Sequence, residues 1–155
     1  MRIREYKDTD KHQILQLHVE FEREFYPRFN TEDHLLEENE LEERYTYFIK
    51  QSGKFWVMED QGVVVGYIGI KLHDDSAELI QLRVRKSHHR RGIGSLLIEK
   101  VEKYALEHGK KQIYLQTAEP LVKARKLYEK LGYTLTNTVE YSGFTVLAYI
   151  KNLII

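Results

Sequence analysis

Two closely spaced glycines, Gly92 and Gly94, follow a predicted strand and a cluster of cationic and imidazole side chains. Apolar residues at helical spacing come directly after them, so a helix is predicted to begin there. Glycine lets the backbone approach a ligand closely and adopt positive φ angles. The first amides of a helix have no acceptor inside it, and the helix dipole is positive at that end. With the charges of Arg90 and Arg91, this order predicts an anion cradle for a pyrophosphate. A solvated basic turn is the alternative.

Two common phosphate-binding loops do not fit this segment. A Walker loop requires a lysine between its last glycine and a hydroxyl residue, whereas Ser95 follows Gly94 directly. A dinucleotide fingerprint requires a third glycine where this chain has Leu97, and it requires an acidic residue after the following strand. The cradle therefore belongs to another class of phosphate site.

Two segments resemble, in the right order, the signatures of the GNAT N-acetyltransferases. The first runs from Leu82 through the glycines and resembles the family's Gln/Arg-x-x-Gly-x-Gly/Ala motif at the start of a helix. The second, ARKLYEKLGY at residues 124–133, resembles the signature A-x-x-LYEKLGF. The chain departs from the family at His89, where Gln or Arg is usual, and at Leu121, where many members have Asn.

This resemblance is strongest over residues 76–133 and implies a fold, a cofactor and a reaction. The implied fold is a single three-layer α/β/α domain over residues 1–155, with a mixed sheet of about seven strands and four helices. The implied reaction moves an acetyl group from acetyl-CoA to a primary amine directly, in a ternary complex. The residues implied to contact the cofactor are Leu82, Arg83, Val84, His89, Arg90, Arg91, Gly92, Ile93, Gly94, Ser95, Thr117, Arg125, Tyr128 and Lys130.

Acetyl transfer to an amine needs a proton acceptor, a proton donor and a polarised carbonyl. Neutralising an alkyl amine at pH 7 costs roughly 4 kcal/mol, so a carboxylate is needed to take its proton. Glu78 stands where the histone acetyltransferase branch of the family has its base; an ordinary surface glutamate is the alternative. Tyr128 matches the family's tyrosine, a donor to the leaving thiolate, or else it is a core aromatic residue. By resemblance, the Val84 amide polarises the carbonyl.

The acceptor pocket carries no recognisable motif. Aromatic side chains are candidates for its walls; those predicted to bind the acceptor are Phe25, Tyr26, Phe29 and Tyr141. Seven acidic residues fall within 32–43 on a predicted helix, and they favour a cationic acceptor or form a solvated helix face. A small-molecule amine and a protein amine both remain open. A CoA-binding module without catalysis is the alternative function.

Composition excludes several other classes of protein. The chain has no cysteine, which excludes disulfides, thiolate metal sites and a cysteine nucleophile. The adjacent His88 and His89 have no third ligand in register, so no metal site is predicted. The formal net charge is zero, which argues against nucleic-acid binding. Residues 1–60 hold 15 acids and 9 bases and residues 61–155 hold 9 acids and 15 bases, which suggests two ligands of opposite charge.

No apolar run approaches the length of a membrane span, and the polar N-terminus does not resemble a signal peptide, so we expect a cytoplasmic protein. The apolar ending Leu153-Ile154-Ile155 indicates either a last core strand or a surface for a second copy of the chain. Periodicity predicts strands at residues 3–6, 55–59, 63–72, 77–84, 112–116, 133–140 and 144–150. It predicts helices over residues 11–25, 31–52, 94–108 and 120–131, with Pro120 at the first helical position.

Overall fold

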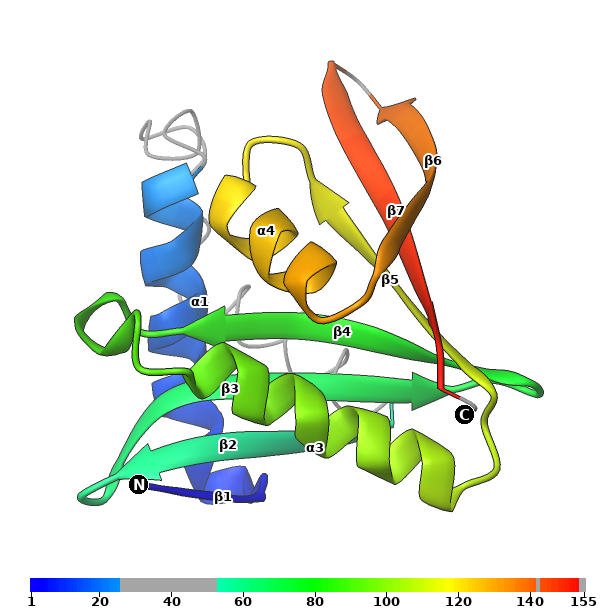
Figure 1. Ribbon diagram of the computed structural model, residues 1–155. Helices are drawn as coiled ribbons and strands as arrows, with labels where there is room; N and C mark the ends of the chain where they lie inside the picture. Colours follow the sequence, from blue (N-terminus) through cyan, green and yellow to red (C-terminus); the bar gives the residue numbers. More distant parts are fainter. Residues whose placement is uncertain (26–52, 142, 154–155) are drawn as a thin grey trace.

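The computed structural model describes residues 1–25, 53–141 and 143–153 (Figure 1). Seven strands of these residues form one sheet in the order β1-β2-β3-β4-β5-β7-β6. They are β1 (Arg2–Glu5), β2 (Lys54–Asp60), β3 (Val63–Leu72), β4 (Ser76–Val84), β5 (Gln112–Ala118), β6 (Thr134–Tyr141) and β7 (Phe144–Asn152). The described α-helices are α1 (Lys11–Phe25), α3 (Ile93–Glu107) and α4 (Val122–Lys130), and the short 3-10 helices are η1 (Asp8–Asp10) and η4 (Lys86–His88).

The helices cover both faces of the sheet, which confirms the predicted three-layer arrangement. Helix α1 lies on one face, and α3 and α4 lie on the other (Figure 1). The core beneath α1 consists of Ile14, Leu17, Phe55, Val57, Val64, Tyr67 and Ile80. The larger core on the opposite face joins α3 and α4 to the sheet and includes Leu97, Ile98, Val101, Leu115, Tyr128 and Tyr149. Strand β3 supplies residues to both cores and is buried from Val64 to Ile70, as its uniformly apolar sequence predicted.

The parallel strands β4 and β5 pair only at their beginnings. Their register contains three residue pairs, from Ser76 opposite Gln112 to Glu78 opposite Tyr114. Beyond these pairs β5 continues alongside β7, while β4 continues alongside β3. The two strands therefore diverge in the direction of their C-terminal ends, as Figure 1 shows. We call this separation of the two strand backbones the β4–β5 gap.

A bulge lies in β4 within its diverging part. The register with β3 shifts between Tyr67 and Gly69, so β4 carries one extra residue there. Gln81 has a positive φ of 55°, an uncommon conformation for a residue other than glycine. A conformation of this kind costs of order 1–3 kcal/mol and is typical of functional sites.

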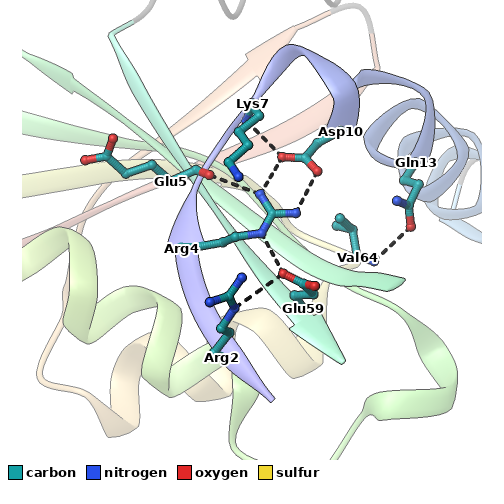
Figure 2. Close-up of polar contacts among 8 residues, drawn as sticks. All are labelled: Arg2, Arg4, Glu5, Lys7, Asp10, Gln13, Glu59 and Val64. Carbon is teal, nitrogen blue, oxygen red and sulfur yellow. Dashed lines mark hydrogen bonds and ion pairs between the residues drawn. The ribbon is translucent and has the colours of Figure 1, made fainter. Parts of the chain in front are cut away.

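At the outer edge of the sheet, the guanidinium of Arg4 joins β1 to β2 and to η1 (Figure 2). Its Nε donates to Glu59 at 2.6 Å, and its two terminal nitrogens donate to the Asp10 carboxylate at 2.8 Å each. The Lys7 amide donates to the same carboxylate at 2.8 Å. Burial alone raises the pKa of Asp10, but the hydrogen bonds and charges of Arg4 and Lys7 outweigh it and hold that pKa below its usual value. Asp10 is thus a buried charge with several partners.

Helix α4 begins two residues later than predicted. Leu121 is its N-cap and Val122 its first residue, so the prediction of Pro120 at the first helical position is wrong. The Leu121 amide donates to the Ala118 carbonyl and the Val122 amide to the Pro120 carbonyl, so the chain turns tightly at Pro120 before the helix begins.

Two other predictions concern residues that are described only in part or not at all. The predicted helix at residues 31–52 lies outside the described residues. At the C-terminus, Leu153 is 7% exposed and packs in the core beneath α3 and α4. Of the two roles predicted for the apolar C-terminal residues, Leu153 has the first, packing in the core. Homodimerisation stays a prediction.

Candidate functional site

The loop between β4 and α3 has alternating backbone conformations. Arg90 and Gly92 have positive φ angles of 65° and 76°, whereas Arg91 between them does not. Alternation of this kind turns successive amides toward one point and makes an anion-binding nest. A Cβ built on Gly92 would meet no atom within 4 Å, so the space beside it is open.

The nest continues into the first turn of α3. The Leu96 amide donates to the Gly92 carbonyl at 3.1 Å, so the amides of Ile93, Gly94 and Ser95 have no acceptor within the helix. These amides, the dipole of α3 and the exposed side chains of the preceding arginines all favour an anion. The geometry supports the predicted pyrophosphate cradle.

His88 and His89 fasten this loop to the sheet. His88 Nε2 lies 2.9 Å from Oδ2 of Asp60, the last residue of β2. His89 Nε2 donates to the carbonyl of Val84, the last residue of β4, 2.8 Å away. His89, predicted to contact the cofactor, thus has a backbone partner at the end of the strand that leads into the loop. No group of three metal-ligating side chains occurs among the described residues.

Gly94 brings the start of α3 against α4. A Cβ at Gly94 would lie 2.9 Å from Cδ2 of Leu127, which is too close for ordinary contact. Leu127 precedes Tyr128 on α4, so the second glycine of the loop lets the start of α3 pack closely against the helix that carries the predicted proton donor.

Glu78 lies at the last paired position of β4 and β5, opposite Tyr114. Its Oε1 accepts a hydrogen bond from the Tyr114 hydroxyl at 3.3 Å and lies 3.1 Å from His73 Nε2. The Tyr114 hydroxyl is also 3.0 Å from His73 Nε2, and the two rings stack with centroids 5.7 Å apart. Burial, followed by the charge of Glu78, raises the pKa of Tyr114. The Glu78 side chain is 27% exposed, so its carboxylate is held in place and still accessible.

Tyr128 is buried on α4, between Tyr133 and Tyr149. Ring centroids lie 5.9 Å from Tyr133 and 6.1 Å from Tyr149. Its hydroxyl has no hydrogen-bond partner among the described residues. Burial raises the pKa of Tyr128 to about 12, and the positive charge of Arg83 acts in the opposite direction. Tyr128 therefore packs in the core as an aromatic residue, and its hydroxyl has no described hydrogen-bond partner. Its role as a proton donor stays a prediction.

Arg83 lies on the diverging part of β4, and its side chain extends to the α1 side of the sheet. Its Cζ is 3.7 Å from the ring centroid of Phe21 on α1. A terminal nitrogen donates to the Leu82 carbonyl at 2.7 Å, and Nε is buried with no described hydrogen-bond partner. The charge of Arg83 acts both on His18 of α1 and on Tyr128 of α4, so Arg83 lies between these helices.

The remaining predicted residues divide between described and undescribed positions. Leu82 and Val84 do not pair with β5, and their carbonyls accept hydrogen bonds from the side chains of Arg83 and His89. Thr117 is buried on β5. On α4, Arg125 donates to the Glu119 carbonyl at 3.0 Å, and Lys130 is exposed.

Most of the predicted acceptor wall is not described. Tyr26 and Phe29 lie outside the described residues, and the side chains of Phe25 and Tyr141 are not described. Phe21, one turn before Phe25 on α1, lies against Arg83 of β4.

Two features of the site were missed by the sequence analysis. Nothing predicted the bulge at Gln81, because a polar residue at a positive φ has no local sequence signature. Arg83 was predicted only as one of the cofactor contacts, and the contact of its side chain with α1 was missed, although a cation between the apolar residues Leu82 and Val84 was a usable signal. In the described part of the chain, no helix has the length and apolar character that a membrane span requires.

Comparison with known proteins agrees with this geometry. The model of the acetyltransferase (GNAT) family matches residues 13–133. A solved aminoglycoside 6'-N-acetyltransferase complexed with coenzyme A superposes with a TM-score of 0.77 at 21% identity, covering 99% of this chain and 98% of that one. At this identity the superposition shows the fold alone.

Curated relatives match over part of their length. N-acetylaspartate synthetase of Homo sapiens is 36% identical over 90 residues, which are 56% of this chain and 30% of that protein. The probable N-acetyltransferase camello of Xenopus laevis is 32% identical over 122 residues, which are 72% of this chain and 56% of that protein. The matched region thus spans 30% to 56% of the length of these two relatives. Because the family model covers most of the chain, including the β4–α3 loop and α4, the protein belongs to the GNAT acetyltransferase family.

Proposed function

We propose that this protein transfers the acetyl group of acetyl-CoA to a primary amine, by direct attack in a ternary complex. Membership of the acetyltransferase family supports acetyl-CoA as the cofactor. The observation that carries the proposal is the β4–β5 gap, which opens after three residue pairs and has the anion-binding nest at the end of its β4 side. If the phosphates of the cofactor bind at the nest, its acyl arm would extend along the part of β4 that does not pair with β5.

The residues of the loop fit a pyrophosphate ester. Donors there are backbone amides of the nest and of the first turn of α3, together with the side chains of Arg90 and Arg91. Gly92 leaves open space beside them. Leu82 and Val84 would face the pantetheine arm, and Thr117, Arg125 and Lys130 would contact the part of the cofactor nearest β5 and α4. When bound, acetyl-CoA supplies the activated acetyl thioester.

The chain's own part in the reaction is to move two protons. A bond forms between the amine nitrogen and the acetyl carbon while the carbon–sulfur bond breaks, so the amine loses a proton and the sulfur gains one. We assign the first proton to the Glu78 carboxylate, directly or through water. Glu78 suits this role because it is the last residue of β4 that pairs with β5, where the two strands begin to diverge. His73 and Tyr114 contact its carboxylate and orient it.

We assign the second proton to the Tyr128 hydroxyl. With a pKa of about 12, Tyr128 keeps its proton at neutral pH and donates to the sulfur as negative charge develops there. No side chain of the described site is arranged as a nucleophile, which favours direct transfer over a covalent intermediate.

The assay that tests this proposal measures thiol release from acetyl-CoA with a panel of primary amines. Acceptor-dependent release with intersecting initial-rate lines supports direct transfer, whereas parallel lines would show a covalent intermediate. Tight binding of coenzyme A without transfer to any amine would instead support a non-catalytic binding module.

The charge of the acceptor is a separate question. The acidic stretch that favoured a cationic acceptor lies outside the described residues. The names of similar proteins point both ways, since one is an aminoglycoside acetyltransferase and the other an N-acetylaspartate synthetase. The described residues supply a further argument, which concerns Arg83.

A further inference from the structure

Arg83 is a partly buried cation whose contacts leave its charge unmatched. The described residues contain no carboxylate within ion-pair distance of it. Arg4, by contrast, lies against Asp10 at 2.8 Å and Glu59 at 2.6 Å. Arginine does not lose its charge in a protein, and removing a charge from water without a counter-ion is expensive. A counter-ion from outside the chain would remove this penalty.

The guanidinium of Arg83 is fixed in place for such a counter-ion. The Phe21 ring covers one face at 3.7 Å, and the Leu82 carbonyl holds one terminal nitrogen at 2.7 Å. Stacking on an aromatic ring leaves the edges of the guanidinium, where its N–H groups point, available for a planar anion. Carboxylates match that edge with two parallel hydrogen bonds.

The neighbours of Arg83 do not supply the missing negative charge. Burial, followed by the charge of Arg83, lowers the pKa of His18 to about 4, so its imidazole is neutral at pH 7. Tyr128 is also neutral at that pH, with its pKa raised to about 12 by burial. In the described part of the site the net charge is therefore one positive unit, which suits a monovalent anion such as a carboxylate better than a phosphate dianion.

The location of Arg83 indicates whether its anion belongs to the cofactor or to the acceptor. Its side chain extends toward α1, whereas the phosphate cradle begins α3 on the opposite face of the sheet. The charge of Arg83 acts on Tyr128, the proposed donor to the leaving sulfur, so the two side chains lie within electrostatic range of each other. A group bound to Arg83 therefore lies on the acceptor side of the gap, close to the position of transfer.

We propose that Arg83 binds a carboxylate of the acceptor, so that the acceptor is an amine that carries a carboxylate, as free amino acids do. This inference rests on the proposed acetyltransferase function and narrows its substrate class. In this proposal the Arg83 side chain has a specificity role in place of the cofactor contact predicted for it from the sequence.

The first test compares acceptors that differ only by the carboxylate. Suitable pairs are phenylalanine with phenethylamine, lysine with cadaverine, and histidine with histamine. A hydrogen-bonded charge pair is worth about 1.5–3 kcal/mol, so we expect the carboxylate-bearing member of the best pair to have a kcat/KM about 10- to 100-fold higher. Equal values within every pair that is turned over would overturn the proposal.

The second test uses variants of Arg83. Arg83→Gln should lower kcat/KM for the amino acid about 10- to 100-fold, mainly through KM, and leave that for its decarboxylated partner nearly unchanged. Arg83→Lys keeps the charge without the planar fork and should fall between the two. The exposed Lys103→Gln on α3 removes the same charge elsewhere and should change neither acceptor. A higher dissociation constant for coenzyme A in Arg83→Gln would assign the side chain to the cofactor and overturn the proposal.

The third test does not depend on turnover. In the presence of coenzyme A, N-acetylphenylalanine and N-phenethylacetamide are compared by calorimetry on the wild-type protein and on Arg83→Lys. We expect tighter binding of the carboxylate compound, with a larger preference in the wild type than in Arg83→Lys, which keeps the charge without the planar fork. If that preference appears while no amine is acetylated, the catalytic proposal fails and the carboxylate site stands. Acetylation of amines without any such preference would overturn the carboxylate site and support the catalytic proposal.

Discussion

The two ends of β4 differ in how their polar groups are satisfied. At its beginning, β4 pairs with β5, and the side chains of His73, Glu78 and Tyr114 bond to one another. In its diverging part, Arg83 has no described carboxylate partner, and the hydroxyl of Tyr128 on α4 has no described hydrogen-bond partner. Gln81 also has a buried Oε1 without a described hydrogen-bond partner.

This difference separates groups that stabilise the fold from groups that serve a ligand. Buried polar groups in proteins are nearly always hydrogen-bonded, so those left unsatisfied together at one place need a reason. At the paired end, a substitution removes bonds within the protein and is expected to affect stability. At the diverging end, the missing partners belong to the ligands, so a substitution is expected to affect activity and leave stability almost unchanged.

Tyr128→Phe gives the largest expected effect on activity. Loss of a proton donor typically reduces the rate about 10²- to 10⁴-fold, and we expect that reduction in kcat. The melting temperature should hardly change, because the hydroxyl has no described partner. Tyr133→Phe is the matched control, because its hydroxyl is also buried without a described hydrogen-bond partner. Equal kcat values for wild type and Tyr128→Phe would remove Tyr128 from the mechanism.

The pH profile of the wild type sharpens this prediction. Because burial raises the pKa of Tyr128 to about 12, its proton is retained well above pH 10. We therefore expect kcat to show no alkaline decline between pH 8 and about pH 10, although an unperturbed tyrosine would begin to titrate there. A decline in that range that is absent from Tyr128→Phe would contradict the burial argument.

Glu78→Gln tests the last paired position of β4 and β5, where the two strands begin to diverge. As the proposed base, Glu78 should contribute about 10²-fold to kcat/KM at pH 7. The deficit should shrink as pH rises, because more of the amine is then already neutral. Tyr114→Phe removes the hydroxyl contacts with Glu78 and His73 but no charge, so its effect should be several-fold smaller. A loss of stability with unchanged activity would make Glu78 purely structural.

Asp10→Asn tests the network at the sheet edge, which is remote from the gap and has its partners in place. Losing charged hydrogen bonds to Arg4 should lower the free energy of unfolding by about 1.5–3 kcal/mol, with kcat unchanged. The folded-state pKa of Asp10 lies below its unfolded value near 4, so its contribution is complete above pH 4 and is lost as pH falls through the folded pKa. Urea unfolding at pH 7 and pH 3 should show that loss in the wild type and less of it in Asp10→Asn.

Gly92→Ala is the mildest of these changes. Gly92 has a φ of 76° and open space around it, so a methyl group introduces backbone strain alone, about 1–2 kcal/mol. We expect weaker binding of coenzyme A by calorimetry, because relief of the strain distorts the nest. Gly62→Ala introduces the same strain in the turn after β2, where φ is 81° and the space is also open. Equal affinities in the two variants would show that the nest does not bind the phosphates.

The elements were largely predictable because their patterns are local. Alternation and apolar runs located the seven strands within a few residues, and the glycines at 92 and 94 located the loop between β4 and α3, where the phosphate cradle stays a prediction. Pro120 misled the assignment of the α4 start, since proline fits a turn before a helix as well as the first helical position.

Other parts of the site depend on the register of distant strands. The cluster at Glu78 requires Tyr114 to lie opposite it in a parallel pair, and no local pattern sets that register. Likewise His88 contacts Asp60, 28 positions earlier in the chain. The bulge at Gln81 forms only where β4 pairs with β3, so the sequence alone did not predict it. The neighbours of Arg83 come from distant elements, so the sequence did not predict them either.

The brevity of the β4–β5 pairing has a mechanical consequence. Three residue pairs act as a pivot between two arms of the sheet, one carrying α1 and the other carrying α4. Ala77, which is fully buried, is the middle residue of β4 in this pairing. A larger side chain there would tilt β4 against β5, and by leverage the separation of the two strands would change most at their far ends.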